Sequence, residues 1–190
     1  MQRKIIDVFL FVILLASIFS FNVFAESAPS TNYNSTCYNE LQLEEERKSW
    51  YTEENIDNFS LNTRSFLTVE ELEAGLQKEL KNYAEIFIEA EKEYNINAIF
   101  LVSVATVESG WGEIPNENNN LFGWNSNVYY ENPEDSILPV AEKLKEYYLS
   151  SDGIYYNGDT VDGVNVKYNG REEWSSLIKS MMIQIADDIY

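Results

Sequence analysis

The stretch that decides the fold covers residues 99–124 and reads IFLVSVATVESGWGEIPNENNNLFGW. It begins with an uncharged and almost entirely apolar run, 99–107, which predicts a buried helix because hardly any polar face is left for solvent. Glu108 stands where this run stops, and two glycines shortly after it predict that the helix ends there. An asparagine-rich loop follows and closes on Leu121-Phe122-Gly123-Trp124. A single carboxylate facing amides and aromatic rings is typical of a cleft that binds carbohydrate.

Apolar side chains recur at helical spacing on both sides of this stretch. Thr68-Val69-Glu70-Glu71 has the pattern of a capping box and begins a helix that continues towards Tyr94, with Gly75 as the point where it weakens or splits. Glu91 is expected on the solvent face of that helix. Asn97 is expected to cap the central helix. Further helices are predicted over about 40–50, 135–149 and 171–187.

Two other segments are predicted to be non-helical. Residues 121–130 combine glycine and asparagine with aromatic side chains, which favours a small β-hairpin or an extended loop. Residues 153–168 hold three glycines and alternating valines. That pattern predicts a loop with one short strand pair.

The N-terminal residues have the pattern of an export signal. Arg3 and Lys4 precede an apolar run, and Val23-Phe24-Ala25 places small residues at a cleavage site, so residues 1–25 are predicted to be a cleaved signal peptide. An uncleaved membrane anchor is the alternative. Residues 26–65 are expected to form a polar tail with a short helix, and residues 66–190 the folded domain.

Composition excludes several classes of function. The formal net charge is −19, so nucleic acid is not expected as a partner, because phosphate binding needs a basic face. The chain has no histidine, which removes Ser-His-Asp and Cys-His catalysis and histidine-based zinc sites. Cys37 is the single cysteine; it has no internal disulfide partner, and is either a free thiol or a lipid-attachment site. Acid–base chemistry must then use Asp, Glu, Lys or Tyr.

Two motifs carry a resemblance to a known family. Val107-Glu108-Ser109-Gly110-Trp111-Gly112 and Asn119-Asn120-Leu121-Phe122-Gly123 resemble the N-acetylglucosaminidases of glycoside hydrolase family 73, which are bacterial peptidoglycan hydrolases. The resemblance extends over roughly residues 66–186 and takes in Tyr168 and Trp174. It implies a mainly α (α+β), lysozyme-like helical domain with a small β-hairpin lining the cleft.

The same resemblance implies that Glu108 is the general acid. Cleavage of a glycosidic bond requires protonation of a poor leaving group. A carboxylic acid can supply that proton near neutral pH if apolar surroundings raise its pKa. The apolar run before Glu108 and Trp111 after it offer such surroundings. A glutamate that merely bonds backbone amides at the helix end is the alternative.

The resemblance also implies a second catalytic carboxylate, and it is expected just after the predicted hairpin. Glu131 is the choice because it follows two tyrosines at the hairpin end, whereas Asp135 is expected to cap a helix and Glu134 to be solvated. The family's substrates carry a 2-acetamido group, and such sugars can supply their own nucleophile. In that case Glu131 only orients water or the amide, or has no role.

Four other residues are predicted to bind substrate. Trp124 is expected to stack on a sugar ring. The resemblance implies that the Tyr168 hydroxyl bonds the acetamido group or the catalytic acid. Asn120 and Phe122 are assigned to the same cleft. The alternative for the three aromatic side chains is core packing. For Asn120 the alternative is shaping of the loop by side-chain bonds to the backbone.

Together these features predict a secreted or wall-associated hydrolase. It is expected to cleave β-1,4 bonds after N-acetylglucosamine in peptidoglycan glycan strands, as a monomer, with no cofactor and no metal. Targeting to the wall is expected to come from the cleft, the tail or another protein. The alternatives are a lytic transglycosylase of the same fold and a non-catalytic glycan-binding protein.

Overall fold

The computed structural model of the protein describes residues 32–125 and 127–190. Two units are present, Met1–Glu40 and Leu41–Tyr190. The described residues of the first unit form the start of helix α2, Asn32–Ser49. The predicted signal peptide lies outside the described residues. Within the described ranges, no helix combines the length and hydrophobicity needed to cross a membrane.

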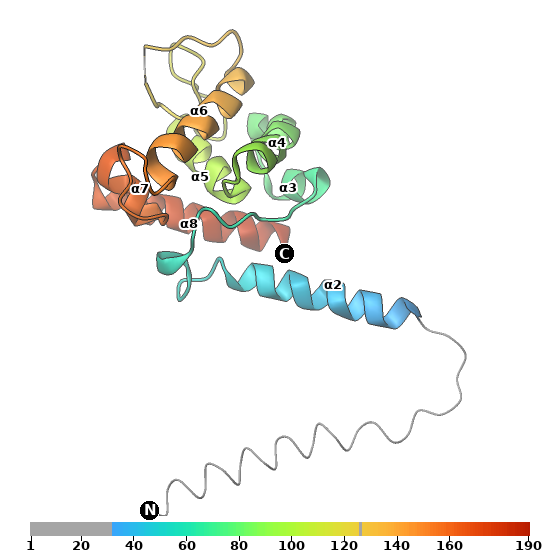
Figure 1. Cartoon of the computed structure of the whole chain (residues 1–190). Coiled ribbons are helices and arrows are strands. Elements are labelled where there is room, and N and C mark those ends of the chain that lie inside the picture. The colour runs from blue at the N-terminus through green and yellow to red at the C-terminus, as the bar shows by residue number, and fades with distance from the viewer. Residues whose placement is uncertain (1–31, 126) are drawn as a thin grey trace, which may run out of the picture. The chain divides into compact units, whose positions relative to one another are not determined.

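The second unit is built from short helices joined by tight turns (Figure 1). In chain order they are η1 (Ile56–Asn58), α3 (Val69–Gly75), η2 (Lys78–Tyr83), α4 (Ala84–Tyr94), α5 (Ala98–Ser109), η3 (Pro133–Ser136), α6 (Ile137–Leu144), η4 (Lys145–Leu149), α7 (Val161–Tyr168) and α8 (Glu172–Ile189). The mainly α fold class is therefore confirmed.

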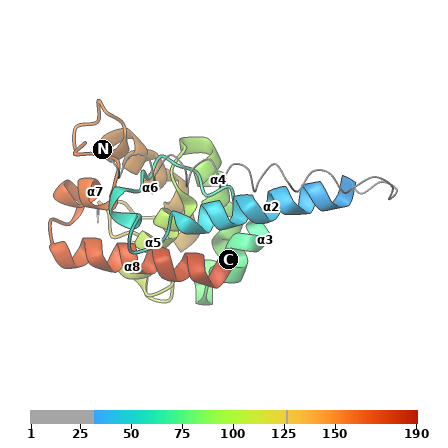
Figure 2. The ribbon, with the colours of Figure 1, turned by 90° about the horizontal axis from the view of Figure 1, so that it is seen from below.

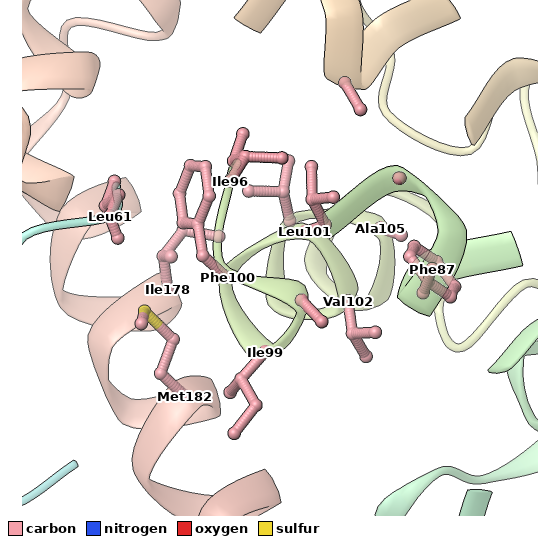
Figure 3. Close-up of a cluster of buried hydrophobic side chains, with 14 of the residues drawn as sticks. Leu61, Phe87, Ile96, Ile99, Phe100, Leu101, Val102, Ala105, Ile178 and Met182 are labelled. Atoms are coloured by element: carbon pink, nitrogen blue, oxygen red, sulfur yellow. The ribbon is translucent and has the colours of Figure 1, made fainter. Parts of the chain in front are cut away.

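Helix α5 lies at the centre of this unit, as its apolar sequence predicts. Its side chains from Ala98 to Thr106 are all buried. Figure 3 shows Phe100 and Ile99 beside Ile178 and Met182 of α8, with Phe87 of α4 on another side of the helix. Figure 2 shows α7 next to the N-terminal end of α8, as Figure 1 does. Helix α8 therefore touches both the central helix and α7.

The helix starts follow local chemistry that the sequence predicts. Thr68 and Glu71 form the capping box of α3, and α3 ends at Gly75, where a split was expected. The Asn97 Oδ1 atom accepts from the backbone N–H of Phe100 at 3.0 Å and caps α5. Each of these bonds satisfies an amide that the first turn of a helix leaves unpaired.

The predicted β-hairpin at 121–130 is wrong, since no strand occurs among the described residues. The Asn119 side chain makes hydrogen bonds across the loop where a hairpin would have bonds between backbone strands. Its Nδ2 atom donates to the carbonyls of Tyr130 and Glu131, at 3.0 Å each. The Tyr130 N–H also donates to the Asn118 carbonyl at 3.0 Å. The two sides of the loop are thus joined by an amide side chain and one backbone bond.

The strand pair predicted within 153–168 is also wrong, because residues 161–168 form helix α7. Thr160 begins this helix by accepting from the Gly163 N–H at 3.2 Å. Val161 and Val164 are buried on one face, three residues apart, which is a helical spacing rather than strand alternation. A Cβ atom at Gly163 would lie 2.4 Å from the Gly158 carbonyl oxygen, so the close turn requires glycine.

Glu91 is buried rather than on the solvent face, at 1% exposure. Its Oε1 atom accepts from the backbone N–H groups of Ser65 at 2.6 Å and Ala98 at 2.9 Å. The Oε2 atom lies 3.8 Å from the Arg64 Nε atom. Glu91 thus joins the chain before α3 to the first turn of α5, which a pattern of apolar spacing alone cannot reveal.

Candidate active site

Glu108 occupies the last turn of the buried helix α5. Its side chain is exposed although its neighbours Ala105 and Ser109 are buried. The helix ends because Gly110 adopts a left-handed conformation with φ +60°, and its N–H donates to the Thr106 carbonyl at 2.9 Å. The rigid central helix therefore presents one carboxylate to solvent at a fixed point.

Trp174 of α8 holds one oxygen of this carboxylate. Its indole Nε1 atom donates to Glu108 Oε1 at 2.8 Å. The Trp174 side chain is itself only 5% exposed, so packing fixes the direction of the donor. The two residues are 66 positions apart and meet because α8 packs against α5.

Gly123 lies against the other oxygen of the carboxylate. A Cβ atom placed on Gly123 would be 3.2 Å from Glu108 Oε2 and 3.8 Å from its Cδ atom. The glycine also has φ +63°, a conformation that other residues rarely adopt. The loop that follows α5 thus returns its backbone to the acid.

The pKa of Glu108 is raised above its ordinary value. Partial burial is the larger cause, and the hydrogen bond from Trp174 acts in the opposite direction by favouring the ionised form. Burial prevails, so a larger share of Glu108 stays protonated near neutral pH than for a glutamate in water. This is the property that a proton donor requires.

Tyr168 of α7 contacts the ring of Trp174. Their ring centroids are 5.0 Å apart with an interplanar angle of 32°. The Tyr168 hydroxyl donates to the Phe122 carbonyl at 2.6 Å. Its burial, and secondly the charge of Glu108, raise the Tyr168 pKa well above its usual value, so the hydroxyl stays protonated. In this structure its partner is the loop backbone.

Trp124 lies at the end of the same loop and is partly buried. A hydrogen bond joins its side chain to Tyr148 and lowers the Tyr148 pKa, although burial raises that pKa by more. Tyr148 in turn contacts the Tyr168 ring, with centroids 5.9 Å apart. An aromatic cluster therefore extends from Trp174 to Trp124, and stacking of Trp124 on a sugar stays a prediction.

Asn120 and Phe122 form the inner side of the loop. Asn120 is 1% exposed; its Nδ2 atom donates to the Trp124 carbonyl at 2.5 Å, and its Oδ1 atom accepts from the Phe122 N–H at 2.9 Å. The Phe122 side chain is completely buried. Their contacts hold Gly123 and Trp124 in place, and a direct contact of either side chain with substrate stays a prediction.

The residues considered for the second carboxylate are placed differently from one another. Glu131 is exposed, and within the described residues its carboxylate has no ion pair. Asp135 is the third residue of η3, whose N-cap is Asn132 rather than Asp135, and its carboxylate accepts from the Asn132 N–H at 2.9 Å as part of a capping box. Glu134 has a side-chain hydrogen bond with Tyr83. Of the three, Glu131 is the one whose carboxylate is not engaged in such a contact.

Sequence reasoning missed that Trp174 holds the acid and that the Gly123 backbone lies against it. Trp174 has the spacing of a core residue in α8, and it is one. Nothing in that spacing indicates that its N–H is directed at Glu108. A buried indole does need an acceptor, so the search for one could have pointed to an acid. The sequence places Gly123 only in the motif Asn119–Gly123 and in the hairpin or extended loop predicted over 121–130.

Two hollows of the surface near the N-terminal half of α8 are lined by none of the predicted site residues. One of about 490 Å³ is lined by Glu172 and Leu177, among others, and another of about 600 Å³ by Asn165 and Lys179, among others. Within the described residues, no group of three or more His, Cys, Asp or Glu side chains is placed to hold a metal ion.

Comparison with known proteins agrees with this arrangement. Two proteins of Streptococcus pneumoniae, from strains TIGR4 and R6, are each 31% identical over 120 residues and are named "Putative endo-beta-N-acetylglucosaminidase". The matches cover 58% of this chain but only 18% and 17% of those proteins. The glucosaminidase family model, described as mannosyl-glycoprotein endo-beta-N-acetylglucosaminidase, matches residues 84–187. That span includes Glu108, Gly123 and Trp174 and exceeds half of the chain, which therefore belongs to the glucosaminidase family of glycosidases.

Proposed function

We propose that this protein hydrolyses β-1,4 glycosidic bonds after N-acetylglucosamine in the glycan strands of peptidoglycan, with Glu108 as the proton donor. The observation that carries the proposal is the setting of the Glu108 carboxylate. It is exposed at the end of a buried helix, has a raised pKa, and is held by the Trp174 indole at 2.8 Å. Membership of a glucosaminidase family supports the same substrate class.

The proposed reaction needs a second group on the opposite side of the sugar. Glu131 is exposed and follows the loop that Asn119 fastens to residues 130–131. It would orient the attacking water or the substrate's acetamido group. If the acetamido oxygen is the nucleophile, replacement of Glu131 reduces the rate less than replacement of Glu108.

Action on peptidoglycan would take place outside the cytoplasm. We propose that residues 1–25 direct export and that the glucosaminidase activity belongs to residues 66–190, within a folded unit that begins at Leu41. Because the net charge is −19, repulsion from anionic wall polymers should be screened by salt. Activity on whole walls should then rise with ionic strength, unless another protein brings the enzyme to its substrate.

Substitution Glu108→Gln tests the proton donor, because it keeps the shape of the side chain and removes the acidic proton. We expect the release of reducing ends from purified peptidoglycan to fall by roughly a hundred- to ten-thousand-fold. Glu85→Gln, at an exposed position of α4, is the matched control and should retain wild-type activity. Full activity of a folded Glu108→Gln variant would overturn the proposal.

Mass spectrometry of the products tests the type of bond cleavage. New reducing N-acetylglucosamine ends are expected. Anhydro-muramoyl ends in their place would identify a lytic transglycosylase, and binding of glycan without any new ends would identify a carbohydrate-binding protein.

A further inference from the structure

We propose that Oε2 of Glu108 is the oxygen that carries and delivers the proton, and that Gly123 is a positioning residue which keeps the space beside this oxygen free of side-chain atoms. The inference rests on the proposed function, since it concerns the same acid. It assigns different tasks to the two oxygens of one carboxyl group, with Trp174 holding the first and Gly123 leaving room at the second.

The first step of the argument concerns Oε1. The indole N–H of Trp174 is a donor and has no acceptor capacity, and it lies 2.8 Å from Oε1. In a protonated carboxyl group the oxygen without hydrogen is the better acceptor. A proton on Oε1 would compete with the indole N–H for the same space, whereas a proton on Oε2 leaves the bond intact. Trp174 therefore selects the oxygen that bears the proton.

The second step concerns the free side of Oε2. A Cβ atom at position 123 would lie 3.2 Å from this oxygen, which is closer than an ordinary van der Waals contact. Gly123 and Glu108 are both exposed, so the space is open to solvent and to a substrate. The loop is held at this point by the Tyr168 hydroxyl on the Phe122 carbonyl, at 2.6 Å.

In the proton-transfer step the Oε2–H bond breaks and its electron pair stays on the Glu108 carboxylate. The glycosidic oxygen takes the proton while its bond to the anomeric carbon breaks, and that electron pair stays on the oxygen. Water then adds to the anomeric carbon and gives up one proton, which restores the acid. A side chain at 123 would push the glycosidic oxygen away from Oε2, and a misplacement of about 1 Å costs roughly a hundredfold in rate.

The matched pair Gly123→Ala and Gly170→Ala tests this. Both glycines have left-handed backbones, with φ +63° and +78°, so both substitutions introduce similar strain. A Cβ at 170 meets nothing within 4 Å, whereas one at 123 meets Glu108. We expect Gly123→Ala to lower kcat on purified peptidoglycan by roughly a hundredfold, and Gly170→Ala to stay within about twofold of wild type.

Equal kcat values for the two alanine variants would overturn the proposal while leaving Glu108 as the acid, provided that Glu108→Gln is inactive. If Gly123→Ala does not fold, the pair Gly123→Asn and Gly170→Asn replaces it, because asparagine tolerates the left-handed conformation. The same inequality is then expected, and its absence contradicts the inference.

A second readout concerns the choice of oxygen by Trp174. The Trp174 N–H that donates to Oε1 favours the ionised form of Glu108, and Trp174→Phe removes this donor. The Glu108 pKa should therefore rise. The decrease of kcat/KM at high pH should then occur at a higher pH than in the wild type, and kcat should be lower. A variant that loses activity but keeps the wild-type pH profile would show that Trp174 only packs the core, and would remove the basis for assigning the proton to Oε2.

Discussion

At the scale of single residues, the acid is set by two opposing influences. Burial raises the Glu108 pKa, and the Trp174 hydrogen bond lowers it. A stronger donor or a wetter site would lower the Glu108 pKa and reduce the share of the carboxyl group that carries a proton. The exposed side of Glu108 is needed for substrate access, so the raised pKa depends on the packed surfaces around the rest of the side chain.

Glu108 should therefore reduce stability at neutral pH. Because its folded-state pKa lies above the unfolded value, the folded chain binds more protons between the two values, and the free energy of unfolding falls as pH rises through them. Glu108→Gln does not titrate, so its stability relative to wild type should increase between pH about 4 and about 7. Urea unfolding at both pH values measures this, and a pH-independent difference contradicts it.

Tyr168→Phe should destabilise the loop that carries Gly123. The substitution leaves the Phe122 carbonyl without its 2.6 Å donor, at a cost of about 1–3 kcal/mol in the free energy of unfolding. The control is Tyr129→Phe, at a side chain that is 68% exposed. Chemical denaturation of both variants provides the comparison, and an equal cost for the two would show that the buried bond contributes nothing.

At the scale of elements, the sequence predicts what depends on neighbours along the chain. The caps at Thr68 and Asn97, the break at Gly75 and the burial of α5 all follow from local hydrogen bonding or apolar content. Helix α7 was missed because its glycine at 163 suggested a loop. Position 163 requires glycine because a Cβ atom would collide with the Gly158 carbonyl, and only folding brings these two residues close.

The same distinction applies to the active site. Glu108 is marked by its place after an apolar run, so the sequence identifies it. Its partners Trp174 and Gly123 come from α8 and from a loop, and their directions depend on how these pack around α5. The absence of the predicted hairpin has a related cause, because the amide of Asn119 bonds the carbonyls of Tyr130 and Glu131 across the loop.

The cap of α5 should contribute more to stability than the cap of α7. Asn97 is completely buried, and besides capping it donates to the Thr63 carbonyl at 2.9 Å and the Tyr51 hydroxyl at 2.8 Å. Asn97→Ala should cost about 2–4 kcal/mol, the sum of a lost cap and buried groups left unpaired. Thr160→Ala removes one capping bond and should cost about 1 kcal/mol. Equilibrium unfolding in urea ranks the two, and the reverse order contradicts the prediction.

At the scale of the whole molecule, the folded unit extends further towards the N-terminus than residue 66. Tyr51, Ile56, Phe59 and Leu61 are buried in the core. The Leu61 N–H donates to the Asp159 carbonyl at 2.7 Å, and the Leu61 carbonyl accepts from the Asn97 N–H at 2.9 Å. This segment has too few apolar residues in a regular pattern to be recognised as core, because it is neither a long helix nor a strand.

Truncated chains should distinguish a folded unit that begins at Leu41 from one that begins at Phe66. A chain that begins at Leu41 should fold and keep its activity. A chain that begins at Phe66 loses four buried apolar side chains, each worth about 1.5–3 kcal/mol, which together approach the total stability of a typical domain, about 5–15 kcal/mol. Circular dichroism during heating measures the outcome, and equal melting temperatures would show that residues 41–65 are dispensable.

The packing of α8 on α5 has a consequence for a chain that is still being synthesised. Glu108 is synthesised 66 residues before Trp174. A nascent chain of intermediate length therefore contains the acid but not the indole that orients it. The central helix also lacks Ile178 and Met182, which lie beside it in the finished protein. The proposed activity would therefore be absent from a nascent chain that does not yet include Trp174.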